Sequence, residues 1–210
     1  MSNETSKSIE RRRVLRGAAW ATPVLAAAIG TPAAAASGGP VCPTCIEPGV
    51  LLGGVTTSQS IVAGNTGALA FAGVFGMDSS NCDLTLFQPL YTSIVTSATL
   101  TMSDGSTHNG TGLGTATGTF GQIGVLPGTW LFSGINFPSG TYLLNSNPVR
   151  PTRITATVNI ILVGLPSLLQ ITCPVTLTWD LNVFATGVVT PSFLGGAGTL
   201  NYTGTATPVL

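Results

Sequence analysis

The chain has 210 residues, of which 44% are hydrophobic and only 7% are charged, and its formal net charge is zero. Soluble domains usually carry about a quarter charged residues, so the side chains that build most catalytic sites are scarce. Nucleic-acid binding needs a cationic surface, which is absent once the basic N-terminal segment is set aside. Because apolar residues are plentiful, we expect a folded chain rather than a disordered one.

Residues 1–36 have the organisation of a removable export signal. A polar start and a basic cluster precede an apolar stretch from about residue 18 to residue 29. This stretch is too short and too rich in alanine for a membrane-spanning helix. Ala34 and Ala36 fit the small-residue rule for signal-peptidase cleavage, so we predict cleavage before Ser37.

The basic cluster predicts the export route. Arg11 and Arg12 precede a spacer, the apolar Leu15 and a further base, Arg16, and this order resembles the twin-arginine consensus. The leader is similar to those of actinobacterial exported proteins, a resemblance confined to this segment. It implies the twin-arginine translocase as a partner and folding before export. An ordinary secretory leader is the alternative.

The mature chain is expected to be secreted or held at the cell surface without a transmembrane anchor. No later stretch is long and apolar enough to span a bilayer, and Gly39-Pro40-Val41 before Cys42 is not a lipoprotein signal. Few charges remain to keep copies apart, so self-association is easy. The charged residues left after cleavage are Arg150, Arg153, Glu47, Asp78, Asp83, Asp104 and Asp180.

Residues 37–49 form a lead-in rich in glycine, proline and cysteine, and residues 50–210 form the predicted domain. The four cysteines, Cys42, Cys45, Cys82 and Cys173, favour two disulfides in an exported chain. Three pairings are possible. We favour Cys82–Cys173 with Cys42–Cys45; the alternatives connect the lead-in to the domain. Redox chemistry at Cys42-Pro-Thr-Cys45 would need a helix N-terminus, which nothing predicts.

The strongest secondary-structure prediction is an antiparallel hairpin over residues 153–183. Residues 171–183 alternate between an apolar row and a row of mostly polar side chains, and residues 153–160 alternate in the same way, which places the two rows on opposite faces of a strand. The connection at residues 164–170 contains glycine and proline. Pro174 cannot donate a ladder hydrogen bond, so we expect an edge or a bend there.

Further strand candidates occur at residues 68–75, 84–87, 97–102, 115–120, 129–132 and 199–206. Turn-forming sequences separate them, and no segment has the period of a helix. Many short strands of this kind predict an all-β fold. We expect an antiparallel β-sandwich of immunoglobulin-like type, preceded by the signal-peptide helix, with a barrel as the alternative architecture.

The sequence favours neither catalysis nor a metal or other cofactor. His108, the single histidine, lies in a loop-like stretch beginning at Asp104, and no nucleophile motif accompanies it. The run from Asp78 to Asp83 is rich in oxygen ligands but lacks the calcium-loop spacing, so a turn is the simpler interpretation. The glycines at 110–118 lack the strand-to-helix setting of a nucleotide site.

Repeated Thr-x-Thr motifs and three aromatic residues are the remaining candidates for binding. The threonines suit solvent-facing strand positions, with a glycosylated or adhesive face, or an ice-binding array, as alternatives. Trp179 lies in the apolar row and is expected in the core, whereas Trp130 and Tyr142, if exposed together, would form a sugar-stacking platform.

The functional prediction is a non-enzymatic, exported surface protein with an adhesive, envelope-structural or recognition role. Its expected partner is the cell envelope or an extracellular polymer. A module that binds carbohydrate or another small extracellular ligand is the first alternative. An oligomeric β-channel of the envelope is the second, because a strand pair with one apolar and one Thr/Asn face suits both architectures.

Overall fold

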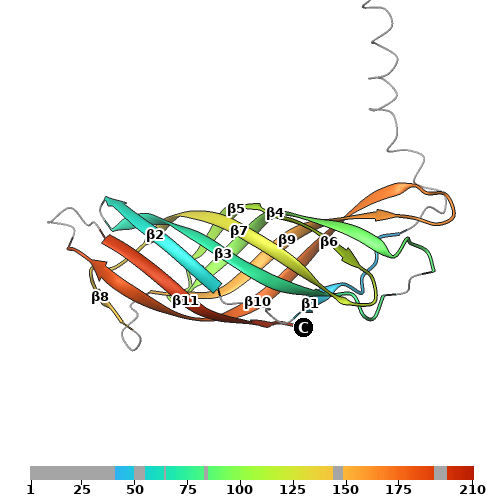
Figure 1. Ribbon diagram of the computed structural model, residues 1–210. Coiled ribbons are helices and arrows are strands. Elements are labelled where there is room, and N and C mark those ends of the chain that lie inside the picture. The colour runs from blue at the N-terminus through green and yellow to red at the C-terminus, as the bar shows by residue number, and fades with distance from the viewer. Residues whose placement is uncertain (1–40, 50–54, 64, 83–84, 144–148, 192–197) are drawn as a thin grey trace, which may run out of the picture. The chain divides into compact units, whose positions relative to one another are not determined.

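The computed structural model describes residues 41–49, 55–63, 65–82, 85–143, 149–191 and 198–210. The predicted leader, with Arg11, Arg12, Leu15, Arg16 and the cleavage site at Ala34, Ala36 and Ser37, lies outside these residues, and so does the predicted helix within it. The described residues form strands joined by turns, and every strand pairing is antiparallel. The all-β, antiparallel prediction is therefore confirmed (Figure 1).

The strands in chain order are β1 (Glu47–Gly49), β2 (Val55–Ala63), β3 (Thr66–Asp78), β4 (Leu90–Met102), β5 (Thr107–Leu113), β6 (Thr115–Thr119), β7 (Ile123–Asn136), β8 (Gly140–Tyr142), β9 (Pro151–Val163), β10 (Gln170–Val189) and β11 (Gly198–Pro208). They are hydrogen-bonded in the order β1-β3-β2-β11-β10-β9-β4-β5-β7, with β6 beside β4 and β8 beside β10.

An additional pairing between β3 and β7 brings the two ends of this order together, and the sheet curls into a barrel. The finer prediction of an immunoglobulin-like sandwich is not confirmed, because the strands share one continuous sheet instead of two packed layers. Period-two alternation is common to both architectures, so the sequence pattern could not separate them.

The predicted hairpin is confirmed as β9 and β10, which we call the aliphatic hairpin. Ile154, Val158 and Leu162 are fully buried, while intervening residues such as Thr155 and Thr157 lie on the other face. Pro174 pairs with Asn159 of β9, in the part of β10 that precedes its pairing with β11. Its missing N–H therefore falls where the strand has one neighbouring strand, as the edge interpretation expects.

On another part of the barrel, β5 and β6 fill the interior differently, and we call them the glycine strands. Gly110 and Gly112 of β5 lie opposite Phe132 and Trp130 of β7 in the register. A Cβ on Gly112 would lie 2.6 Å from Trp130 Nε1, a distance that real Cβ atoms do not show. The glycines supply the space that the fully buried aromatic side chains occupy. This is the role of the glycine run, which is not part of a nucleotide site.

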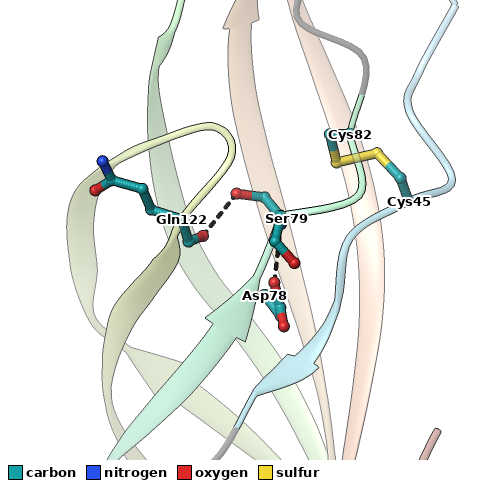
Figure 2. Close-up of a disulfide and its surroundings, with 6 residues drawn as sticks. Cys45, Asp78, Ser79, Cys82 and Gln122 are labelled. Atoms are coloured by element: carbon teal, nitrogen blue, oxygen red, sulfur yellow. Dashed lines mark hydrogen bonds between the residues drawn. A yellow bond between two sulfur atoms is a disulfide. The ribbon is translucent and has the colours of Figure 1, made fainter.

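The disulfides are Cys42–Cys173 and Cys45–Cys82, with Cα–Cα distances of 5.5 Å and 5.2 Å (Figure 2). The favoured pairing of Cys82 with Cys173 and Cys42 with Cys45 was wrong. Pro43 favours an extended backbone at Cys42, which opposes the tight turn that a Cys42–Cys45 bridge needs. Each lead-in cysteine instead bonds to a cysteine of the barrel. Both bridges therefore fix the lead-in to the sheet.

Two local predictions need correction. Residues 84–87 were expected to form a strand, but Thr85 and Leu86 lie in a turn and Phe87 makes an isolated bridge with Gly164. The stretch from Asp104 to Gly110 was expected to form a loop, whereas β5 begins at Thr107, so His108 lies on a strand. Both errors come from short segments in which turn-forming residues obscure the alternation.

Candidate functional site

The most regular feature of the outer surface is a polar face across β5, β4, β9 and β10, which we call the threonine wall. In one row, Asn109 of β5, Thr99 of β4, Thr155 of β9 and Thr178 of β10 are successive register partners. The next row contains Thr111, Ser97, Thr157 and Thr176. Neighbouring strands are about 4.8 Å apart and alternate residues along a strand about 6.7 Å, so the side chains form a two-dimensional array.

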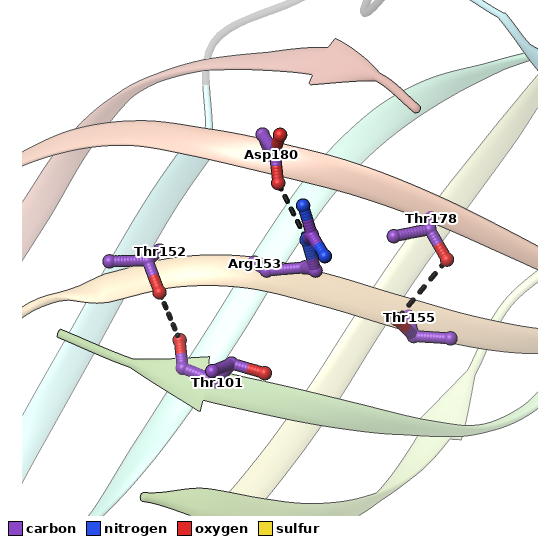
Figure 3. Close-up of polar contacts among 6 residues, drawn as sticks. All are labelled: Thr101, Thr152, Arg153, Thr155, Thr178 and Asp180. Carbon is purple, nitrogen blue, oxygen red and sulfur yellow. Dashed lines mark hydrogen bonds and ion pairs between the residues drawn. The ribbon is translucent and has the colours of Figure 1, made fainter. Parts of the chain in front are cut away.

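Hydrogen bonds hold several of these side chains in fixed directions. Thr99 Oγ1 donates to Asn109 Oδ1 at 2.9 Å. The hydroxyls of Thr155 and Thr178 lie 3.2 Å apart (Figure 3). Thr152 Oγ1 donates to the Thr101 carbonyl oxygen at 3.1 Å, also across strands (Figure 3). Cross-strand pairs of this kind stabilise a sheet and restrict the rotamers of its outer face. The wall is an ordered surface of hydroxyl and amide groups.

One ion pair lies within the wall. Arg153 Nε donates to Asp180 Oδ1 at 2.6 Å across β9 and β10 (Figure 3). The hydrogen bond to Asp180 raises the pKa of Arg153 above its usual value. Both side chains are about half exposed, so solvent screens their attraction and the pair adds little to stability.

His108 belongs to a short hydrogen-bonded chain with Ser106 and Asp104. Ser106 Oγ donates to Asp104 Oδ1 at 2.7 Å and lies 3.1 Å from His108 Nε2. A serine hydroxyl has one proton, so the imidazole must donate in the second contact. In a hydrolase triad the imidazole accepts the serine proton, which is the reverse polarity. Hydrogen bonds from Ser106 also lower the pKa of Asp104, and the group acts as a turn brace.

The oxygen-rich run after β3 is also a turn, in the part of it that the structure describes. The Ser80 N–H donates to Asp78 Oδ1 at 2.8 Å. Hydrogen bonds from the side chain and the backbone of Ser80 lower the pKa of Asp78. Ser79 Oγ donates to the Gln122 carbonyl oxygen at 2.9 Å, beside the Cys45–Cys82 bridge (Figure 2). Among the described residues, no group of three or more metal-ligating side chains comes together.

The aromatic residues proposed for sugar stacking do not form an exposed platform. Trp130 and Tyr142 are both fully buried, so the condition for the platform that the sequence left open is not met. Trp179 is buried as predicted, and its indole N–H donates to the Gly49 carbonyl oxygen at 3.0 Å. Trp130 packs instead on Phe71 and Phe75 of β3. The interior of the barrel is a packed aromatic and aliphatic core.

Sequence reasoning missed two exposed apolar surfaces. The first, which we call the apolar strip, lies on the glycine-strand side and contains Val74, Leu113, Val125 and Leu131. Val74 and Leu113 line a shallow groove of about 410 Å³. The second, which we call the leucine tip, contains Leu86, Leu90, Leu165, Leu168 and Leu169. For the tip, the signal available in the sequence was the high leucine content of its two segments.

Comparison with protein-family models, with curated proteins and with solved structures finds no match for this chain. No helix with the length and hydropathy of a membrane span occurs in the part of the chain that the structure describes. The function of the protein is therefore inferred from the surfaces and contacts described above.

Proposed function

We propose that this protein is exported and acts without catalysis at the cell surface or in its surroundings, by adhesion to an uncharged polymer of the envelope or matrix. The observation that carries the proposal is the threonine wall. It offers hydroxyl and amide groups in a fixed array, and polyhydroxylated polymers present complementary donors and acceptors at repeated intervals.

The two disulfides support the compartment. Each bridge joins the lead-in to the barrel, and such bonds persist in oxidising environments outside the cytosol. The predicted twin-arginine leader agrees with this location. Export in folded form would also suit a barrel whose strands close through pairings between distant parts of the chain.

The packing of the wall supports adhesion. Its side chains stand on strands whose inner faces are fully buried, so the array is held rigidly. Each hydroxyl contact is weak, but many aligned contacts to one polymer add through effective concentration. The scarcity of charge on the wall predicts binding that resists salt, because screening acts on charged contacts.

The contacts of His108 support a non-catalytic role. Its imidazole donates to Ser106 and lies next to a carboxylate-braced turn, so it is placed to stabilise that turn. The burial of Trp130 and Tyr142 removes the observation that would have favoured a carbohydrate-binding module built on them.

The first test is fractionation of the producing cells with intact-mass analysis of the protein. We expect the mass of residues 37–210 less four hydrogen atoms, in the medium or surface fraction. A cytosolic protein with free thiols and an intact N-terminus would contradict the proposal.

The second test is co-sedimentation with protein-stripped cell walls of the producing strain. Thr157 and Thr176 are register partners in the wall, and T157K/T176K places two cations in the array. We expect about tenfold weaker binding at any salt concentration. T66K/T141K makes the same chemical change at two exposed threonines outside the wall, and this control should bind like the parent. Equal loss in both variants would contradict the assignment of the wall.

A further inference from the structure

The leucine tip combines two turns at one end of the barrel. The β9–β10 connection supplies Leu165, Leu168 and Leu169, and the segment before β4 supplies Leu86 and Leu90. Their exposed fractions are 38%, 61%, 49%, 55% and 65% respectively. The hairpin projects at the end of the sheet (Figure 1). Isolated exposed leucines are ordinary on protein surfaces, but a contiguous group at a projecting end is not.

Backbone hydrogen bonds hold the two turns together. Leu165 N donates to the Leu86 carbonyl oxygen at 2.8 Å, and Gln88 N donates to the Val163 carbonyl oxygen at 2.8 Å. Gly164 N donates to the Leu169 carbonyl oxygen at 2.9 Å and closes the hairpin turn. The Cys42–Cys173 bridge braces β10 shortly after the turn. The leucines are therefore presented by a preorganised scaffold, which lowers the entropic cost of binding.

Leu168 has a backbone conformation that leucine rarely adopts. Its φ is 56°, in the left-handed region that glycine and asparagine tolerate better. The same residue exposes most of its apolar side chain to water. Both features oppose folding in water, so a contact made outside the folded chain is the simplest reason for a leucine at this position.

The chemistry of the tip identifies the contact. Residues 85–90 and 164–170 contain no ionisable side chain, so the tip has no charge to remove from water and no attraction for an anionic surface. The N–H groups of Gly164 and Leu165 and the carbonyl groups of Leu86 and Leu169 are already paired, so these four backbone groups lose little on leaving water. A projecting end with leucines on two turns fits a fluid interface, which adapts to its shape, better than a rigid protein pocket.

We propose that the leucine tip inserts into the interface of an electrically neutral lipid layer. Apolar side chains entering the boundary between headgroups and acyl chains would attach the protein, with the barrel remaining in water. This inference goes beyond the proposed adhesion, because it requires no contact of the threonine wall.

The test is flotation of the isolated, disulfide-bonded protein with vesicles of phosphatidylcholine. We expect the parent to float with the vesicles and to remain bound at about 1 M salt. L168D/L169D should lower the partition coefficient about tenfold or more. L113D/L131D makes the same change at exposed leucines of the apolar strip and should leave partitioning unchanged within about twofold. T157K/T176K should also float, which separates this test from that of the adhesion proposal.

Leu168→Asn provides a variant in which a loss of lipid binding cannot be explained by unfolding. Asparagine accepts the left-handed backbone but removes the apolar contact, so partitioning should fall while the melting temperature stays the same or rises. Absence of parent binding to neutral vesicles, binding only to anionic vesicles with loss in salt, or equal loss in both double aspartate variants would each overturn the proposal. A concentration-dependent dimer abolished by L168D/L169D, without lipid binding, would assign the tip to a second copy instead.

Discussion

The aliphatic hairpin and the glycine strands line one core by opposite means. In β9 and β10, branched side chains point inward and threonines point outward, so each strand supplies its own share of the interior. In β5 and β6, Gly110, Gly112 and Gly118 occupy inward positions, and the space beside them is filled by Trp130, Phe132 and Tyr91 from neighbouring strands. On the outer face both regions contribute to the threonine wall, since Asn109 and Thr111 of β5 belong to it, and β5 also borders the apolar strip at Leu113.

The difference shows that a strand can be essential to a core to which it contributes almost no side-chain volume. Loss of volume is the expected damage in the aliphatic hairpin, because its side chains are the filling. In the glycine strands, an added side chain is the expected cause of destabilisation, because aromatic rings occupy the space that the glycines leave. Substitutions that change volume in each direction therefore distinguish the two regions.

The largest expected effect follows from adding one methyl group to a glycine strand. The Cβ of Gly112→Ala would lie 2.6 Å from both Trp130 Nε1 and Val95 Cγ1. We expect a loss of about 3 kcal/mol in the free energy of unfolding, measured by urea denaturation. The adjacent Thr111→Ala, on the exposed face of the same strand, is the control and should change it by less than about 0.5 kcal/mol.

A double variant tests the cause of that loss. Trp130→Leu alone should destabilise by about 3 kcal/mol, because it leaves a cavity. Combined with Gly112→Ala, the added methyl group enters that cavity, so the double variant should cost at least about 1 kcal/mol less than the sum. Strict additivity would show that Gly112 is not reserved for the indole.

The second effect concerns pH, since all three tyrosines of the chain are buried. Tyr91 lies against Gly118 of β6, and Tyr142 and Tyr202 belong to the two strands that pair with the second half of β10. Burial raises the pKa of Tyr91 and Tyr202, and it raises that of Tyr142 to about 12 from a usual value of 10.0. The folded state therefore keeps these protons to higher pH than the unfolded state. Stability is complete below about pH 10 and is lost as the pH rises towards 12.

Alkaline titration followed by tyrosinate absorbance and circular dichroism checks this effect. We expect no tyrosinate before the fold is lost, and then a single cooperative transition. Tyr142→Phe and Tyr202→Phe should each shift the alkaline midpoint upward, because each removes a proton that the unfolded state releases. Gradual ionisation in a folded protein would contradict the burial of these rings.

The aliphatic hairpin was predictable because most of its residues follow the elementary strand rule. Thirteen positions from Ile171 to Val183 alternate, and burial alternates with them. Of the glycine strands, β6 was predicted at residues 115–120, but β5 was missed, because glycine at an inward position has no hydropathy signal and resembles a turn. The closure of the sheet was also hidden, since the β3–β7 pairing depends on contacts between segments far apart in the sequence.

The candidate surfaces divide in the same way. The Thr-x-Thr motifs and the Arg153–Asp180 pair were visible in the alternation, so the threonine wall follows from local sequence and register. The leucine tip was not visible, because exposure of leucines depends on how two distant turns meet. The disulfide pairing failed for a similar reason, since it is set by where the lead-in lies along the sheet.

A smaller difference concerns two buried tryptophans, Trp179 of β10 and Trp130 of β7, which lies opposite Gly112 of β5. Trp179 donates its indole N–H to the Gly49 carbonyl oxygen, whereas Trp130 Nε1 has no hydrogen-bond partner among the described residues. Trp179→Phe removes the bond and leaves a buried acceptor, so it should cost about 1 kcal/mol more than Trp130→Phe. Urea denaturation of the two variants measures this difference, and equal costs would show that the Gly49 contact contributes nothing.

The smallest expected effect is on the exposed face of the aliphatic hairpin. Arg153 and Asp180 are the only oppositely charged side chains that pair directly among the described residues, but solvent reaches both. Arg153→Ala, Asp180→Ala and the double variant should melt at the same temperature as the parent, in low and in high salt. If the single variants lost several degrees at low salt only, the wall would depend on charge, and its attribution to hydroxyl register would fail. Unchanged melting leaves the inner aliphatic row as the main source of the hairpin's stability.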